Sequence, residues 1–289
     1  MFAKLKRKLI WNVLKLPLPD KWMLSLRYYQ FFGVWIDWRH PRSFNEKIQY
    51  MKLYDRRPEY VREADKCRAK QWVAEKVGAR YVVPDYGVWT SAEAIDFDGL
   101  PDQFVLKCNH DSGSVVICTD KSSFDREGAR KRLSRALKRD FSKLAGEWVY
   151  RDIPRRVFAE RYLDAHTPEG MVDYKFFCFH GAPEYLYVSS GLSNHATARM
   201  CFLFPDWTMA PFQRSDYLPF ETLPPKPSCL EEMLSVCRAL SEGHPFLRID
   251  LYEIEGRVYF SEATFYPNGG YIPFLTPEMD VAAGAYLKI

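Results

Sequence analysis

The stretch that decides the fold is Phe246–Gly270, which reads FLRIDLYEIEGRVYFSEATFYPNGG. Residues 247–254 alternate apolar and polar side chains, and residues 258–264 are aromatic and β-branched, so each segment predicts a β-strand. The segment between them, Glu255-Gly256-Arg257, contains a glycine that suits a short turn. The sequence therefore predicts a β-hairpin.

Charged side chains of this hairpin fall on particular faces of its strands. Alternation places Arg248, Asp250 and Tyr252 on one face of the first strand, while Glu262 and Thr264 share a face of the second. If the two faces coincide, two carboxylates converge beside a guanidinium. Such a group is a hard oxygen site for a divalent cation with a phosphate clamp next to it. The alternative is a set of salt-bridged charges on a strand surface.

Composition limits the class of protein. The chain has 289 residues, enough for one large domain or two to three subdomains, and its 47% hydrophobic and 27% charged content is ordinary for a folded protein. A net charge of +4 is too weak to indicate nucleic acid as the main partner. The seven cysteines include no C-x-x-C pair, so neither a zinc site nor a disulfide framework is indicated.

The first sixteen residues, MFAKLKRKLIWNVLKL, are basic and amphipathic. One interpretation is a first helix that packs on the domain with a basic outer face. The other is an interfacial helix that contacts an anionic membrane. The chain has no apolar run long enough to span a bilayer, and we expect no signal peptide. The expected location is the cytoplasm, with peripheral contact at the inner face of the membrane left open.

The N-terminal part reads as mostly helical. The capping-box pattern of Ser43 and Glu46 predicts a helix start there. Helices are predicted over residues 21–32, 44–54 and 58–77. The lysines of the last helix, Lys66 and Lys70, are interpreted as solvated helix charges, with a substrate-facing role as the alternative.

A polar loop follows a strand that ends in a lysine. Residues 104–107 form the strand, and Asn-His-Asp-Ser-Gly-Ser follows after Cys108. Backbone N–H groups of such a loop can cradle phosphate, and Lys107 supplies a point charge to the same anion. The alternative is an ordinary hairpin loop. His110 is either structural or contacts phosphate or substrate. The basic helical segment at 124–148 is either a solvated face or a docking surface for an anionic polymer.

Two further segments complete a recognisable order. Residues 156–163 predict a strand ending in Glu-Arg-Tyr-Leu, and residues 173–188 predict two strands around a His-Gly-Ala-Pro turn. In order, the chain carries a strand lysine with a loop, a strand-end glutamate, D-x-K, R-x-D and E-x-T strands, and Pro-Asn-Gly-Gly. This order resembles the ATP-grasp fold from about Phe44 to the end. It looks closest to the TupA-like branch, the amidoligases of bacterial cell-surface polysaccharide synthesis.

The resemblance implies an α+β protein whose two lobes clasp ATP, with a mostly helical N-terminal region. The expected divisions are a helical region at 1–60, an N-terminal subdomain at 61–100, a small lobe with the phosphate loop at 101–163, and a C-terminal lobe with the metal site at 164–289. It further implies that the nucleotide phosphates bind Lys107 and the loop residues Ser112, Gly113 and Ser114.

The resemblance also assigns the hinge, which is the strand end that joins the two lobes, and the catalytic strands. The main chain of the hinge, at Glu160, Arg161, Tyr162 and Leu163, is expected to contact the edge of the adenine ring. Asp173 is expected near the ribose or orienting Lys175.

By the same match, Lys175 and Arg248 bind phosphate and act in catalysis. Mg²⁺ is expected on Asp250 and Glu262. Most ATP-grasp relatives outside the TupA-like branch have asparagine where Thr264 stands, so the third ligand is either Thr264 or Asn268.

The implied activity is that of an ATP-dependent carboxylate–amine ligase, which forms an amide through an acyl phosphate. The expected partners are ATP, a uronic-acid-containing saccharide on a lipid-linked or polymeric acceptor, and an amino acid or amine. The loop over residues 189–227 supplies two candidate substrate contacts besides His110, namely Arg199 for a carboxylate and Trp207 for a sugar face. Two alternatives remain: a glycosyltransferase, which requires a nucleotide sugar and a D-x-D motif, and a non-catalytic membrane-associated scaffold.

Overall fold

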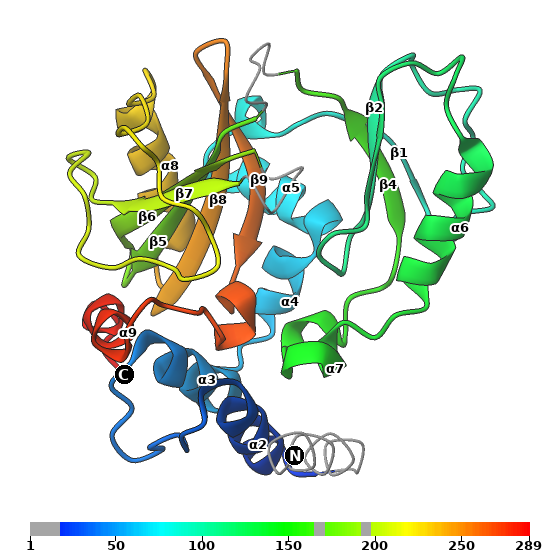
Figure 1. Ribbon diagram of the computed structural model, residues 1–289. Helices are drawn as coiled ribbons and strands as arrows, with labels where there is room; N and C mark the ends of the chain where they lie inside the picture. Colours follow the sequence, from blue (N-terminus) through cyan, green and yellow to red (C-terminus); the bar gives the residue numbers. More distant parts are fainter. Residues whose placement is uncertain (1–17, 165–170, 192–197) are drawn as a thin grey trace.

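The computed structural model describes residues 18–164, 171–191 and 198–289. Two antiparallel sheets with helices around them make an α+β protein, as predicted (Figure 1). The proposed membrane-contacting segment at 1–16 lies outside the described residues. Within the described residues, no helix combines the length and the hydropathy that a bilayer crossing requires.

The smaller sheet has four strands in the order β1-β4-β2-β3. They are β1 (Asp85–Trp89), β4 (Val157–Arg161), β2 (Phe104–Cys108) and β3 (Val115–Cys118). Helix α6 (Arg126–Leu137) covers its outer face (Figure 1). Strand alternation divides β2, because Phe104 and Leu106 pack against α6 in a hydrophobic core while Val105 and Lys107 point to the opposite face.

The larger sheet has five strands in the order β7-β6-β5-β8-β9. They are β7 (Arg199–Leu203), β6 (Ala182–Ser190), β5 (Asp173–Phe179), β8 (Phe246–Ile254) and β9 (Arg257–Thr264). Helix α8 (Leu230–Ser241) packs on β5, β6 and β8. The predicted hairpin is confirmed, with a two-residue turn at Glu255 and Gly256. Both turn residues have positive φ, as a type I′ turn requires.

Helices account for most of the N-terminal part. They are α2 (Asp20–Phe32), α3 (Phe44–Tyr54), α4 (Glu59–Ala64) and α5 (Lys66–Lys76). The predicted capping box at Ser43 and Glu46 is present. The single helix predicted over 58–77 is wrong, because the chain is extended at Asp65 (ψ 109°). The Asp65 carboxylate caps a new helix by accepting hydrogen bonds from the N–H groups of Cys67 and Arg68.

Short elements connect these layers. The short helices are α7 (Ser142–Ala145) and α9 (Pro277–Gly284), and the 3₁₀ turns are η1 (Ala79–Tyr81), η2 (Trp148–Tyr150) and η3 (Pro267–Gly270). Lys52 of α3 is fully buried and ties several of them together. Its ammonium donates to Gln49 Oε1 at 3.1 Å, to the Ala145 carbonyl at 2.7 Å and to the Gly269 carbonyl at 2.5 Å.

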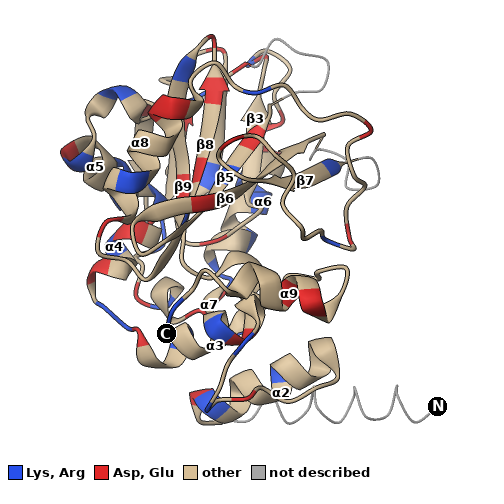
Figure 2. Ribbon diagram, turned by 90° about the vertical axis from the view of Figure 1, so that its left-hand side faces the viewer, with Lys and Arg blue, Asp and Glu red and all other residues tan. Residues whose placement is uncertain are grey.

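Charges of both signs are interspersed on the visible outer helices. Figure 2 shows Lys or Arg beside Asp or Glu on α5 and α8, and charged residues also on the strands β8 and β9. The outer helices therefore present a mixed surface in this view. Arg248 and Asp250 of β8 and Glu262 of β9 belong to the candidate site described below.

Candidate active site

Three charged side chains form a row across neighbouring strands of the larger sheet. Asp250 of β8 lies directly opposite Glu262 of β9, and on its other side it lies opposite Lys175 of β5. The β8–β9 register shifts just after Asp250, where Ser261 is the extra residue of a bulge. Bulges commonly re-aim side chains next to active sites. Asp250 and Glu262, which the sequence analysis placed on one face of each strand, therefore lie on the same face of the sheet.

Arg248 joins this row through its guanidinium. Its Nε lies 2.6 Å from Asp250 Oδ1 and its Nη2 lies 2.7 Å from Oδ2, which makes a bidentate pair. The same Nη2 donates to Glu262 Oε1 and to the Thr264 hydroxyl, each at 3.1 Å. Burial alone would lower the pKa of Arg248, but the Asp250 carboxylate outweighs this and raises that pKa. Arg248 therefore stays charged in the site.

The two carboxylates differ in their electrostatics. Asp250 is fully buried, and burial raises its pKa although Arg248 and Lys175 oppose that change. Burial also opposes ionisation of Glu262, but Lys66 and Arg248 outweigh it and hold the pKa of Glu262 well below its usual range. Glu262 is consequently a permanent anion at neutral pH.

Lys175 completes the row on the β5 side. Its ammonium lies 2.8 Å from Asp250 Oδ2 and 3.3 Å from Asp173 Oδ1. Burial would lower the pKa of Lys175, but Asp250 and Asp173 raise it well above its ordinary value. Asp173 and Lys175, predicted to share one strand face, are therefore paired, and the ammonium is held against the face that carries Asp250.

The predicted phosphate loop is held in place by its first residue, Asn109, rather than by Lys107 of the preceding strand. Asn109 is fully buried, and its Nδ2 donates to Asp65 Oδ1 at 2.8 Å and to the Pro154 carbonyl at 2.9 Å. Its Oδ1 accepts from the N–H of Arg156 at 2.8 Å. By contrast, Ser112 and Gly113 at the tip of the loop are exposed.

Lys107 leaves the strand toward the inter-sheet side and pairs with Glu160. The two side chains meet at 2.5 Å, and Lys70 of α5 contacts the other oxygen of Glu160 at 2.7 Å. Burial opposes ionisation of Glu160, yet the two lysines hold its pKa below the usual range. Glu160 is thus a buried carboxylate with a lysine on each side.

A pocket of about 230 Å³ lies between the smaller sheet and the β8–β9 hairpin. Its apolar walls include Val105 and Ile117 on one side and Phe260 on the other. Its lining also includes five of the predicted nucleotide-binding residues, namely Lys107, Glu160, Arg161, Tyr162 and Leu163. The Arg161 guanidinium donates to the Tyr259 hydroxyl at 2.8 Å across the two lobes. An apolar slot with a few polar groups at its rim suits a planar heteroaromatic ring.

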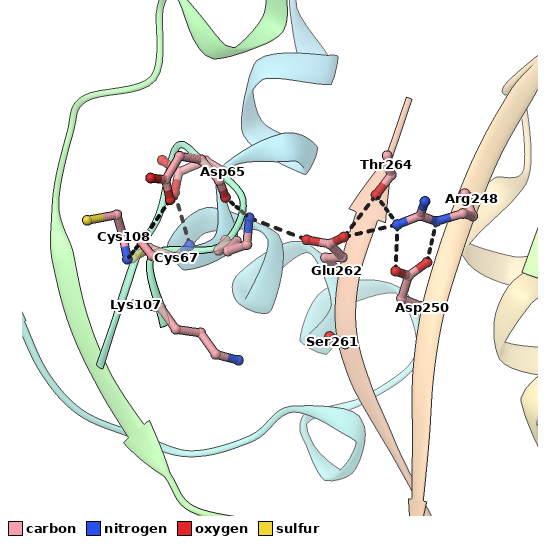
Figure 3. A network of polar contacts seen from close by, with 12 residues as sticks. Asp65, Cys67, Lys107, Cys108, Arg248, Asp250, Ser261, Glu262 and Thr264 are labelled. Atoms are coloured by element: carbon pink, nitrogen blue, oxygen red, sulfur yellow. Dashed lines mark hydrogen bonds and ion pairs between the residues drawn. The ribbon is translucent and has the colours of Figure 1, made fainter. Parts of the chain in front are cut away.

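The predicted Mg²⁺ ligands are partly together. Thr264 Oγ1 lies 3.3 Å from Glu262 Oε1, beside the carboxylate pair (Figure 3). Asn268 is exposed, and its side-chain oxygen accepts from Arg214 at 3.0 Å. Over the described ranges, no cluster of three or more His, Cys, Asp or Glu side chains suits a metal. Mg²⁺ is usually held by one or two carboxylates plus substrate phosphates, so the pair fits this ion.

The three predicted substrate contacts lie in different surroundings. Arg199 starts β7, the far edge strand of the sheet, and contacts the Pro219 carbonyl at 2.8 Å and Glu221 at 2.7 Å. Trp207 is only 8% exposed and donates to the Pro224 carbonyl, which leaves little ring surface for a sugar. His110 is buried, and among the described residues neither ring nitrogen has a hydrogen-bond partner.

Lys66 and Lys70 are site residues that the sequence interpretation left on a solvated helix face. Lys66 contacts Glu262 Oε2 at 3.3 Å, and Lys70 contacts Glu160. Their i, i+4 spacing places them on one face of α5, close to the face that buries Ala69 and Val73. That shared face was the available signal that the two lysines point into the protein.

One D-x-D triplet occurs in the chain, at Asp96-Phe97-Asp98. Asp96 accepts hydrogen bonds from the backbone N–H groups of Asp98 and Gly99, and Asp98 pairs with Arg126 at 2.9 Å. The triplet therefore closes a turn beside α6 and lies on a different part of the smaller lobe from the inter-sheet pocket.

The sequence model of the TupA-like ATPgrasp family matches residues 46–288. No curated protein matches the chain. Similar solved structures include a D-alanine–D-alanine ligase from Bacillus anthracis complexed with ATP, with 17% identity, a TM-score of 0.39, and coverage of 71% of this chain and 54% of that ligase. The chain thus spans about half the length of that ligase.

Two further solved structures resemble the chain. D-cycloserine synthetase DcsG has 16% identity, a TM-score of 0.43 and coverage of 79% of this chain and 72% of its own. A D-alanine–D-alanine ligase from Helicobacter pylori has 17% identity, a TM-score of 0.40 and coverage of 83% and 68%. Since the family match spans most of the sequence, the chain belongs to the TupA-like ATP-grasp family.

Proposed function

We propose that the protein is an ATP-dependent carboxylate–amine ligase. The observation that carries this proposal is the row of Lys175, Asp250 and Glu262, joined by Arg248 and placed beside the inter-sheet pocket. Family membership supports the same chemistry. The row combines anions that suit a divalent cation with cations that suit phosphate.

The proposed reaction has two steps. A substrate carboxylate oxygen attacks the γ-phosphorus of ATP, the bond to the β–γ bridging oxygen breaks, and an acyl phosphate and ADP form. An amine then attacks the acyl carbon, inorganic phosphate leaves, and the amine gives up a proton as the amide forms. Lys175 and Arg248 offset the negative charge on the phosphoryl oxygens.

The nucleotide is proposed to bind in the pocket between the lobes. The adenine ring takes the apolar slot, and the backbone of Glu160–Leu163 contacts its edge. Lys107 and the loop at Ser112–Ser114 bind the phosphates, and Asp173 lies near the ribose or orients Lys175. Asp250 and Glu262 would hold Mg²⁺, with Thr264 nearer to them than Asn268. When bound, this ion neutralises the phosphate charge and polarises the γ-phosphoryl group.

The substrates are proposed from the resemblance to amidoligases of surface-polysaccharide synthesis. The carboxylate belongs to a uronic acid of a bacterial polysaccharide or its lipid-linked precursor, and the amine is an amino acid or amino sugar. Arg199, which is now paired with Glu221, is kept as the candidate contact for the substrate carboxylate and would exchange that partner on binding. Trp207 is not carried forward, because its ring is packed inside the protein. The proposed location is the cytoplasm.

Melting temperatures with and without Mg²⁺-ATP test the proposal. Wild type is compared with Asp250→Asn and Glu262→Gln, and Glu127→Gln on the exposed face of α6 is the matched control. We expect Mg²⁺-ATP to raise the melting temperature of wild type and of the control but not of the two site variants. Uronic acids are then paired with amines and screened for release of ADP. A shift with UDP-sugars and none with ATP would instead favour a glycosyltransferase, and no shift at all would favour a scaffold.

A further inference from the structure

A second cavity lies at the β7 edge of the larger sheet, whereas the nucleotide pocket lies at the opposite edge, beside the β8–β9 hairpin. Its volume is about 420 Å³, compared with about 230 Å³ between the lobes, and the two cavities share no lining residue. Met200 and Phe202 of β7 contribute to one wall, and residues 209–213 and 219–224 form most of the rest. We call this cavity the β7 pocket.

The lining of the β7 pocket is mainly apolar and partly adaptable. Three of its side chains are methionines from separate segments, Met200 of β7, Met209 of the following loop and Met279 of α9. Methionine side chains are flexible and adjust to the shape of a ligand. Met209 and Leu223 are 60% and 48% exposed. Large apolar side chains that stay exposed around a cavity are typical of a binding site for an apolar group.

The composition of the lining favours a hydrocarbon chain over a sugar. Sugar hydroxyls that leave water need hydrogen-bond partners inside a site. Among the described lining residues, amide, carboxylate or hydroxyl side chains come only from Gln213, Glu221 and Thr222. The Glu221 carboxylate is already paired with Arg199. The pocket therefore suits a ligand part that brings few polar groups.

Arg199 places a positive charge beside this apolar lining. Its guanidinium donates to the Pro219 carbonyl at 2.8 Å and to Glu221 at 2.7 Å, and both of these residues line the pocket. The Glu221 side chain is 81% exposed, and such an exposed ion pair contributes little to stability. An anionic group of a ligand can therefore replace Glu221. A guanidinium pairs with carboxylate and phosphate alike.

The β7 pocket continues the row of charged side chains across the sheet. Phe202 lies directly opposite Tyr187 of β6, and Tyr187 lies directly opposite Lys175 of β5. Directly opposed residues of neighbouring strands share a face, and strands lie about 4.8 Å apart. Phe202 is therefore on the same face as Lys175, about 10 Å away across the sheet. A molecule held in the pocket can extend along this face to the catalytic row.

We propose that the β7 pocket binds the hydrocarbon chain of a lipid-linked acceptor, and that Arg199 contacts the anionic group next to that chain. This inference rests on the proposed ligase function and deepens it, because it selects the lipid-linked precursor over a free polysaccharide. The saccharide part of the same molecule extends from the pocket toward Lys175, where its carboxylate meets the nucleotide.

Binding of dodecyl phosphate tests the proposal without nucleotide or saccharide. Calorimetric titrations below the critical micelle concentration compare wild type with Met209→Glu and Leu223→Glu. We expect wild type to bind, and each variant to bind at least about tenfold more weakly, because it places a charge in an apolar wall. Leu275→Glu is the matched control, since Leu275 is 53% exposed and lies outside the pocket. Its affinity should stay within about twofold of wild type.

A neutral probe, dodecyl maltoside, separates the chain from the anionic group. Leu223→Glu should weaken its binding as well, and a loss confined to dodecyl phosphate would reduce the effect to charge repulsion and overturn the chain site. Arg199→Gln should weaken dodecyl phosphate about tenfold, as for the loss of one charged contact, and leave dodecyl maltoside within about twofold. Equal effects of this variant on the two probes would overturn the role of Arg199.

Failure of this inference can be distinguished from failure of the proposed function. Nucleotide binding is measured separately, with Mg²⁺ and the non-hydrolysable analogue AMP-PNP. If wild type binds AMP-PNP but not dodecyl phosphate, or if both pocket variants bind dodecyl phosphate like wild type, the β7 pocket alone is overturned. If dodecyl phosphate binds through the pocket but no nucleotide binds, the ligase function fails, and the role of the pocket in acceptor binding fails with it.

Discussion

Asp250 and Glu262 are direct cross-strand partners in the β8–β9 pair, and the guanidinium of Arg248 contacts both. A fully buried carboxylate such as Asp250 is stabilised only by the cations around it, since water is excluded. The protein's own cations therefore hold the proposed metal ligands in place before any ligand binds. The same cations lie beside the positions proposed for the divalent cation and for the phosphate oxygens. The stability of the protein and its chemistry depend on the same contacts.

Replacing Arg248 with methionine should destabilise the protein and abolish turnover. The substitution leaves the buried Asp250 paired with Lys175 alone among its present ion-pair partners, and removal of one member of a buried pair costs about 3–5 kcal/mol. Urea unfolding measures the free energy of unfolding, and ADP release measures turnover. Arg257→Met at the exposed hairpin tip is the control and should change neither. A drop below about 1 kcal/mol for Arg248→Met would contradict the buried-pair account.

Lys107→Met should weaken the binding of ATP analogues and of ADP alike. Lys107 flanks the pocket, so its contact would be with phosphates that both nucleotides carry. Loss of affinity by about tenfold is expected for each, which is about 1.4 kcal/mol. The fold should survive, because Glu160 keeps Lys70 as a partner. Calorimetric titration with Mg²⁺-ADP decides the point, since unchanged ADP binding would place Lys107 away from the inner phosphates.

Local sequence patterns were sufficient for the hairpin and for its charged face. The period-two alternation of Arg248 and Asp250, together with the glycine turn, depends only on neighbouring residues. The capping box at Ser43 could be predicted for the same reason, since its hydrogen-bond donors and acceptors lie within four residues. The opposing positions of Asp250 and Glu262 do not follow from the turn alone, because a two-residue turn with regular pairing would place Asp250 opposite Ser261, and the bulge at Ser261 brings Glu262 there instead.

Contacts between segments that are distant in the sequence could not be predicted from local patterns. Lys66 reaches Glu262 only because α5 packs against β9, and nothing local to either residue encodes that packing. Asn268 was considered as a metal ligand by its position in the loop, yet its side-chain oxygen accepts from Arg214, 54 residues earlier. The expected metal ligands, the nucleotide contacts and the division into four segments stay predictions.

Asn109→Ala should destabilise the protein and loosen the phosphate loop. The substitution removes three side-chain hydrogen bonds of a fully buried residue and leaves Asp65 without one of its donors. We expect a loss of about 2–4 kcal/mol in the free energy of unfolding, because each buried group left unsatisfied costs about 1–3 kcal/mol. Urea denaturation measures it, with Gln103→Ala on the exposed surface as control. Equal stabilities of the two variants would show that the loop is held by other contacts.

Glu147 should make the stability of the protein depend on pH. Burial raises the pKa of this carboxyl to about 7, although the nearby Lys52 opposes the change. Between the ordinary value of 4.5 and about 7, the folded state keeps a proton that the unfolded state has released. This contribution is therefore fully present below pH 4.5 and is lost as the pH rises through 7.

Glu147→Gln isolates that contribution, because glutamine resembles the protonated carboxyl at every pH. Wild type and the variant should have similar free energies of unfolding at pH 4.5. At pH 8 the variant should be the more stable by about 1–3 kcal/mol, since a tenfold difference in proton affinity between the folded and unfolded states corresponds to about 1.4 kcal/mol. Urea unfolding of both proteins across this range gives the difference directly. A difference that does not change with pH would mean that Glu147 is ionised in the folded protein, with the Lys52 ammonium sufficient to stabilise its charge.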